Sequence, residues 1–180
     1  MSDAFVQRLS TVVVVVCLLT VAGTSALLVS PTLRGWVGVG PGAAPPDYVV
    51  GDRIDVASAL YQSAPVTVVV FARSTCPACQ KSADFHRQVS TTAGAIGVPV
   101  RLVTPSPELA AEQAYASGLG IASERVHVVS SGSIRLRAVP ALMVVDSAGT
   151  IQHVWFGAPD AAVQATILQT LHSLEGARRP

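Results

Sequence analysis

VTVVVFARSTCPAC, residues 66–79, is the stretch of this chain that decides its fold. Its first part, Val66 to Phe71, is an unbroken run of apolar and β-branched residues, which predicts a strand buried on both faces. Its second part holds Cys76 and Cys79, and Pro77 between them suits the first turn of a helix. A helix places residues three apart on one face, so both thiols point the same way. A strand that leads into C-x-x-C and a helix is typical of redox-active thiols.

The two cysteines have different predicted roles. Cys76 lies at the predicted helix N-terminus, where unpaired backbone N–H groups and the helix dipole favour a thiolate. We therefore predict that Cys76 attacks and that Cys79, one turn deeper, resolves the mixed disulfide. Thr75 or Ser74 is expected to cap the helix, and Thr75 alternatively donates to the thiolate. Arg73 is expected to be a solvated surface charge. A disulfide that closes so short a loop restrains little of the unfolded chain, which argues against a purely structural bridge.

Composition excludes several function classes. Half of the 180 residues are hydrophobic, and the formal net charge is +1. Without a basic patch, nucleic acid is not an expected partner. Two cysteines are too few ligands for zinc or copper, and His86 lies about 10 Å beyond Cys79 along a helix axis. His127 and His153 fall on separate predicted strands, so we expect neither a metal nor another cofactor.

The N-terminal segment predicts export of the rest of the chain. Between Arg8 and Arg34 there is no charged residue, and Val12 to Val29 is the apolar centre of this stretch. A helix of about 20 residues spans a bilayer core, so residues 1–34 are predicted to form a short tail and a transmembrane anchor. The alternative is a cleaved signal peptide, with Thr24 to Ala26 as a small-residue cleavage site. Either interpretation places the following domain outside the cytoplasmic membrane.

The remaining chain divides into a linker and one domain. Residues 35–47 are rich in glycine and proline and predict a linker, which leaves residues 48–180 as the folded domain. Within it, strands and helices alternate first, and a hairpin with a final helix closes the chain. This order predicts an α/β fold, with a mixed sheet and helices on both faces. The expected strands are 66–71, 98–103, 125–129, 141–145 and 151–156, and the expected helical segments are 55–61 capped by Asp55, 76–90, 108–117 capped by Ser106, and 159–174.

This order of elements resembles the thioredoxin fold. In detail it is similar to the membrane-anchored TlpA/ResA branch, close to the AhpC/TSA redoxins. The resemblance is carried by the strand leading into Cys76-Pro77-Ala78-Cys79, by a helical insertion over residues 105–121, and by residues 137–151, where Val139-Pro140 precedes a hairpin. It covers roughly residues 49–174, most of a typical single domain.

The resemblance implies both a site and an activity. In that family the proline before the hairpin is cis and faces the cysteines, so Val139 and Pro140, with Thr75, are expected to position the substrate. The implied function is an extracytoplasmic thiol–disulfide oxidoreductase that exchanges the Cys76–Cys79 disulfide or dithiol with thiol- or disulfide-containing proteins, and more often reduces them. The chain departs from the family at Thr75, where tryptophan is usual, and it lacks an acid directly after Cys79.

Other functions remain open at this point. A peroxiredoxin-like peroxidase usually carries P-x-x-x-T-x-x-C, whereas Thr75 is directly adjacent to Cys76. A metal-delivery thiol module and a non-catalytic docking domain would retain the same scaffold. The direction of electron flow is not encoded in the motif, because C-x-x-C proteins span roughly −270 to −120 mV.

Overall fold

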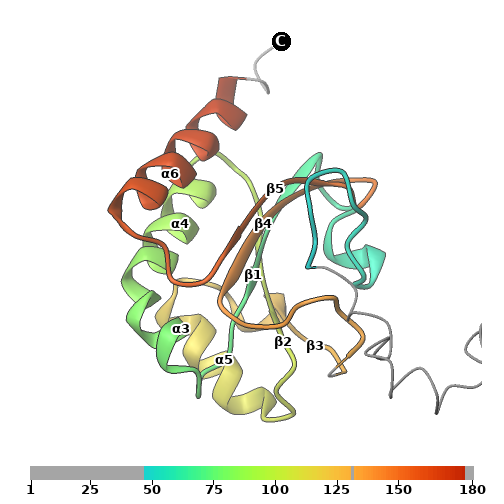
Figure 1. The fold of residues 1–180 in the computed structure, drawn as a ribbon, viewed down its shortest axis with the longest axis vertical. Coiled ribbons are helices and arrows are strands. Elements are labelled where there is room, and N and C mark those ends of the chain that lie inside the picture. Colours follow the sequence, from blue (N-terminus) through green and yellow to red (C-terminus); the bar gives the residue numbers. More distant parts are fainter. Residues whose placement is uncertain (1–46, 131, 177–180) are drawn as a thin grey trace, which may run out of the picture. The chain divides into compact units, whose positions relative to one another are not determined.

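Five strands form a single mixed sheet in the computed structural model, which describes residues 47–130 and 132–176 (Figure 1). Their order is β3-β2-β1-β4-β5, in which β1, β2 and β3 are parallel, β4 is antiparallel to β1, and β5 is antiparallel to β4. The predicted mixed sheet is therefore confirmed. The strands are β1 (Val66–Phe71), β2 (Val100–Thr104), β3 (Val126–Val128), β4 (Ala141–Asp146) and β5 (Ile151–Phe156).

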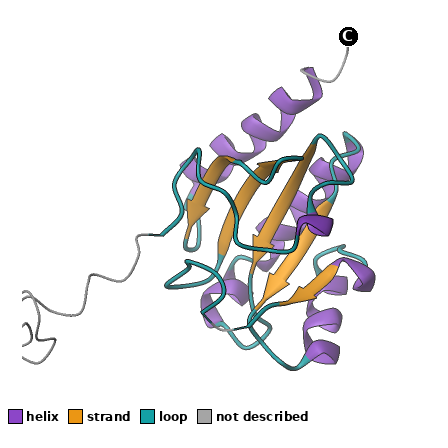
Figure 2. Cartoon of the chain, turned by 90° about the vertical axis from the view of Figure 1, so that its right-hand side faces the viewer, coloured by secondary structure: helices purple, strands orange, loops and turns teal. Residues whose placement is uncertain are grey.

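The α-helices gather on one face of the sheet, as Figures 1 and 2 show from two directions. Their buried side chains pack in one cluster with Val68, Val70 and Leu102 of the sheet. The helices are α3 (Pro77–Lys81), α4 (Ala83–Ala95), α5 (Leu109–Gly118) and α6 (Ala161–Gly176), and two short 3-10 turns are η1 (Ser58–Leu60) and η2 (Ser123–Arg125). The helical residues in this cluster include Phe85, Val89, Ala116, Ile167 and Leu171.

The opposite face is covered differently from the prediction. Among the described residues, it packs against the segment 48–61 and the loop 129–139, with η1 as the only helical turn in that cluster. The prediction of helices on both faces was therefore wrong. The covering side chains, such as Tyr48, Ile54 and Tyr61, come from irregular backbone.

Several predicted boundaries moved because side chains compete with the backbone for hydrogen bonds. The helix expected over residues 76–90 is interrupted at Ser82, whose Oγ donates to Ala78 O at 3.0 Å, and the second part continues to Ala95. Asp55 does not cap η1, because its carboxylate accepts from the Tyr48 hydroxyl at 3.0 Å instead.

The cap expected at Ser106 was also misplaced. Helix α5 begins at Leu109, after Glu108, which makes no side-chain capping hydrogen bond. Ser106 Oγ accepts from the backbone N–H of Glu108 at 3.3 Å, so it closes the turn before the helix.

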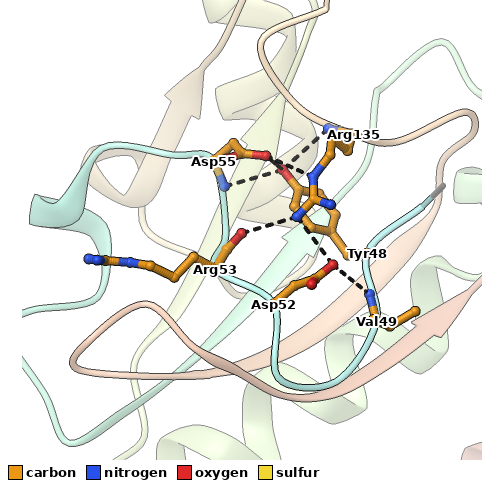
Figure 3. Close-up of polar contacts among 6 residues, drawn as sticks. All are labelled: Tyr48, Val49, Asp52, Arg53, Asp55 and Arg135. Carbon is orange, nitrogen blue, oxygen red and sulfur yellow. Dashed lines mark hydrogen bonds and ion pairs between the residues drawn. The ribbon is translucent and has the colours of Figure 1, made fainter. Parts of the chain in front are cut away.

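A polar cluster fixes the loop before β4 against the N-terminal segment of the domain (Figure 3). Arg135 Nε donates to Asp55 Oδ2 at 3.1 Å, and Arg135 Nη2 lies 3.1 Å from Asp52 Oδ2. The Arg135 guanidinium carbon also lies 4.6 Å from the centroid of the Tyr48 ring, and the Arg135 backbone N–H donates to the Tyr48 hydroxyl at 3.2 Å. The loop that carries residues 132–139 is thus held at its middle.

The described residues from Asp47 onward form one compact unit. The predicted anchor and almost all of the predicted linker lie in residues 1–46, outside the described residues, so these assignments stay predictions. Within the part of the chain that the structure describes, no helix combines the length and apolarity that crossing a membrane requires.

Candidate functional site: a dithiol beside a cis-proline loop

The strand pairing brings two distant segments to one edge of the sheet. The chain leaves β1 after Phe71 and reaches Cys76 a few residues later. Because β4 is antiparallel to β1, its first residue, Ala141, pairs with Phe71. Pro140 therefore lies at the same edge as the cysteines. The Val139–Pro140 peptide bond is cis, and Cys76 Sγ lies 3.5 Å from the carbonyl oxygen of Val139, which confirms the predicted bond and its position against the thiols.

Cys76 is itself the N-cap of α3. Its Sγ accepts a hydrogen bond from the backbone N–H of Cys79 at 3.3 Å, and Pro77 occupies the start of the helix as predicted. The expected cap by Thr75 or Ser74 was wrong, because the thiol takes the capping position. The Thr75 side chain is exposed beside it. The helix N-terminus thus stabilises negative charge on Cys76 Sγ directly.

The two free thiols differ in exposure and in acidity. Cys76 is 8% exposed, and Cys79 is completely buried. Burial raises the pKa of Cys76, but hydrogen bonds from the Cys79 thiol and from backbone N–H groups, together with the Arg73 charge, bring it below its ordinary value. Burial and the Cys76 thiol raise the pKa of Cys79 to about 12. Arg73 is exposed as predicted, yet its charge acts on both thiols.

We expect this difference to appear in the pH dependence of the reduced protein. Near neutral pH, iodoacetamide should modify Cys76 and leave Cys79 intact, as peptide mass spectrometry would show. Below pH 9 Cys79 is protonated in both folded and unfolded chains, so it contributes no pH dependence. Above pH 9.0, its ordinary pKa, the unfolded chain loses this proton while the folded chain keeps it up to about pH 12. Stability should therefore fall over that range, by up to about 1.4 kcal/mol per pH unit.

Cys79→Ala is the matched control for this titration. Tyrosines also ionise at high pH, so the quantity to compare is the difference in unfolding free energy between the Cys79→Ala variant and the unmodified reduced protein at each pH. That difference should shift in favour of the variant as the pH rises from 9 to 11. An unchanging difference would contradict a raised pKa for Cys79.

A buried carboxylate supports the backbone just before the thiols. Glu112 on α5 is fully buried, and its carboxylate accepts from the Ser74 backbone N–H at 2.9 Å and from Ser74 Oγ at 2.8 Å. From the next turn of α5, the Tyr115 hydroxyl donates to the carbonyl oxygen of Cys79 at 3.1 Å. Helix α5 thus holds the residues on both sides of the active thiol.

Sequence reasoning missed both residues of α5. The signal was present, because Glu112, Ala116 and Leu119 stand at i, i+4 and i+7, the spacing of a buried helix face, and all three are buried. A glutamate on such a face needs a polar partner. The identity of that partner, Ser74, depends on the tertiary fold and has no local signal.

The histidines do not join the thiols. His86 is buried on α4, and burial lowers its pKa to about 4, so it is neutral at physiological pH. His127 lies on β3 and His153 on β5, at opposite edges of the sheet. Within residues 47–130 and 132–176, no group of three or more His, Cys, Asp or Glu side chains is arranged to hold a metal ion.

Comparison with known proteins identifies the fold. No family model matches the sequence, and no curated protein matches it. Among solved structures, a protein assigned as thiol:disulfide interchange protein DsbE from Chlorobium tepidum is similar at 18% identity and a TM-score of 0.51, covering 64% of this chain and 83% of that one. A protein assigned as a protein disulfide isomerase from Bacteroides thetaiotaomicron is similar at 15% identity and a TM-score of 0.53, covering 75% and 89%. At these identities the property that the three chains share is the thioredoxin-like fold.

Proposed function

We propose that this chain is a thiol–disulfide oxidoreductase whose Cys76–Cys79 pair exchanges with cysteines of partner proteins. One observation carries the proposal: the more acidic thiol, Cys76 Sγ, lies 3.5 Å from the Val139 carbonyl, with the second thiol one turn behind it. A nucleophile, a resolving thiol and a backbone acceptor for an extended partner segment therefore meet at one place. The two solved structures described above, whose assigned names state such activities, support the same proposal.

The exchange proceeds in two displacements. The Cys76 thiolate attacks one sulfur of the partner's disulfide, which forms a mixed disulfide and releases the partner's other sulfur as a thiolate. Cys79 then attacks Cys76 Sγ, which closes the internal disulfide and releases the second partner thiolate. The Cys79 proton passes to a departing thiolate, and solvent supplies the proton that Cys76 gave up earlier. The partner gains two electrons and is reduced, while this protein is oxidised.

We propose further that the reducing direction is the physiological one. The resemblance to the TlpA/ResA branch supports this direction. Equilibration with dithiothreitol and glutathione redox buffers, followed by mass spectrometry of the alkylated protein, measures the reduction potential. We expect a value nearer to roughly −270 than to −120 mV. A potential at the oxidising end would reverse the proposed direction, and failure to cycle between dithiol and disulfide would refute the proposed function itself.

We propose that the domain works outside the cytoplasmic membrane on an N-terminal anchor. The support is the uncharged stretch between Arg8 and Arg34, which is long enough to span a bilayer. Carbonate extraction of membranes from cells expressing the full chain tests the anchor, and we expect the protein to stay in the membrane pellet. A released protein that lacks about 26 N-terminal residues would instead identify a cleaved signal peptide.

A further inference from the structure

A hollow opens beside the proposed active thiol. It has a volume of about 250 Å³, and Val139, whose carbonyl contacts Cys76 Sγ, forms part of its wall. The wall comes from three separate segments: the chain after β1, the chain after β2 and the loop before β4. Its lining residues include Arg73, Pro105, Ile134, Leu136, Arg137 and Val139.

The lining combines apolar walls with two arginines. Ile134, Leu136 and Val139 are each partly buried against the core, so they present a fixed apolar surface. Arg73 is exposed, and within residues 47–130 and 132–176 no carboxylate forms an ion pair with it. The Arg137 side chain is 62% exposed, and its ion pair with Asp47 joins Nε to Oδ2 at 3.9 Å, which leaves most of its N–H groups available.

The loop that carries this lining is held in place by Arg135 and by the main chain of Arg137. Arg135, between Leu136 and Ile134, is bound to Asp52, Asp55 and Tyr48 in the cluster of Figure 3. The Arg137 backbone N–H donates to Asp47 Oδ1 at 3.0 Å, which fixes its main chain, whereas its guanidinium forms the longer 3.9 Å ion pair with Asp47 Oδ2. A preformed wall loses little conformational entropy when a partner binds.

We propose that this hollow selects partner proteins in which the reactive cysteine is flanked by an apolar side chain and a carboxylate. The inference rests on the proposed function, because the hollow is useful only when the partner's sulfur meets Cys76. The apolar side chain fills the space between Ile134, Leu136 and Val139. The carboxylate pairs with Arg73 and Arg137, whose planar N–H groups match its geometry.

Synthetic peptides test the proposal. Each peptide contains one cysteine, one leucine and one variable residue, which is Glu, Gln or Lys. In one series the leucine and the variable residue precede the cysteine, and in the other series they follow it. The measurement is the rate at which each peptide thiol opens the Cys76–Cys79 disulfide of the full chain, by rapid quenching and mass spectrometry. In at least one series we expect the Glu peptide to react about fivefold faster than the Gln peptide at low salt, and the Lys peptide to react more slowly still. The difference should shrink as salt is added.

Charge reversal provides the decisive comparison. Arg137→Glu should invert the order, so that the Lys peptide reacts fastest when each rate is divided by the rate of the same variant with uncharged dithiothreitol. Arg125→Glu makes the same charge change at the opposite end of the parallel strands, where β3 begins, and should leave the order intact. Replacing the peptide's leucine by serine should slow the Glu peptide.

Each contrary result has a separate meaning. Equal rates for the Glu and Lys peptides in both series, with normal dithiothreitol reduction, would overturn the carboxylate preference alone. The same change of order in Arg137→Glu and Arg125→Glu would also overturn it, since the effect would then come from net charge. A disulfide that neither dithiothreitol nor any peptide opens would refute the proposed function, and the inference with it.

Discussion

Replacing Cys79 by serine should trap a partner protein as a stable mixed disulfide on Cys76, whereas replacing Cys76 by serine should trap none. The physical reason is the difference between the thiols: Cys76 is slightly exposed and has a lowered pKa, while Cys79 is completely buried with its pKa raised to about 12. Without Cys79 the second displacement cannot occur, so the first intermediate accumulates. Without Cys76 the remaining thiol is protonated and inaccessible, and turnover should fall to the uncatalysed background.

The trapping experiment needs a background with only these two thiols. The chain has three cysteines, and Cys17 lies outside the described residues, so both variants are best made together with Cys17→Ser. Incubation with a protein disulfide substrate, followed by non-reducing mass spectrometry, gives the yield of adduct. Equal adduct yields from the two variants would contradict the roles assigned to Cys76 and Cys79. If neither variant forms an adduct and Cys76 also fails to react with iodoacetamide, Cys76 is not the nucleophile.

The strands and the thiol motif could be predicted from sequence because their signals are local. The run Val66 to Phe71 has the composition of a central strand, and it lies between β2 and β4. The position of Val139-Pro140 beside Cys76 was predicted through resemblance to a fold, since no local pattern relates residues this far apart. Their contact follows from the pairing of Ala141 with Phe71.

The parts that sequence did not predict depend on tertiary contacts. The cover of the second sheet face includes Tyr48, Ile54 and Tyr61, which lie on irregular backbone outside any helix or strand. Cys76 caps α3 with its own Sγ, and the Ser74 hydroxyl donates to the buried Glu112 carboxylate instead. Propensity ranks serine and threonine above cysteine at an N-cap, so the sequence alone favoured the wrong residue.

Glu112→Ala should produce the largest loss of stability among single changes around the site. Removing the carboxylate leaves the Ser74 backbone N–H and Oγ without their acceptor, beside a side chain that is fully buried. A buried donor without a partner costs about 1–3 kcal/mol, so we expect the free energy of unfolding to fall by about 2–3 kcal/mol. Urea unfolding of the reduced protein measures this. Because Ser74 leads into Cys76, the alkylation rate of Cys76 should change in the same variant.

Two matched variants distinguish the effect of the lost hydrogen bonds from the effect of the lost charge and from the effect of any substitution in this helix. Glu112→Gln keeps an oxygen for Ser74 and removes a charge that has no cationic partner within the described residues, so its stability should stay within about 1 kcal/mol of the parent. Glu108→Ala, at the exposed start of the same helix, should change stability by less than about 0.5 kcal/mol. If Glu112→Ala were as stable as Glu108→Ala, the carboxylate would not support the thiol loop. If Glu112→Gln lost as much stability as Glu112→Ala, the charge of the carboxylate rather than its acceptor geometry would hold Ser74 in place.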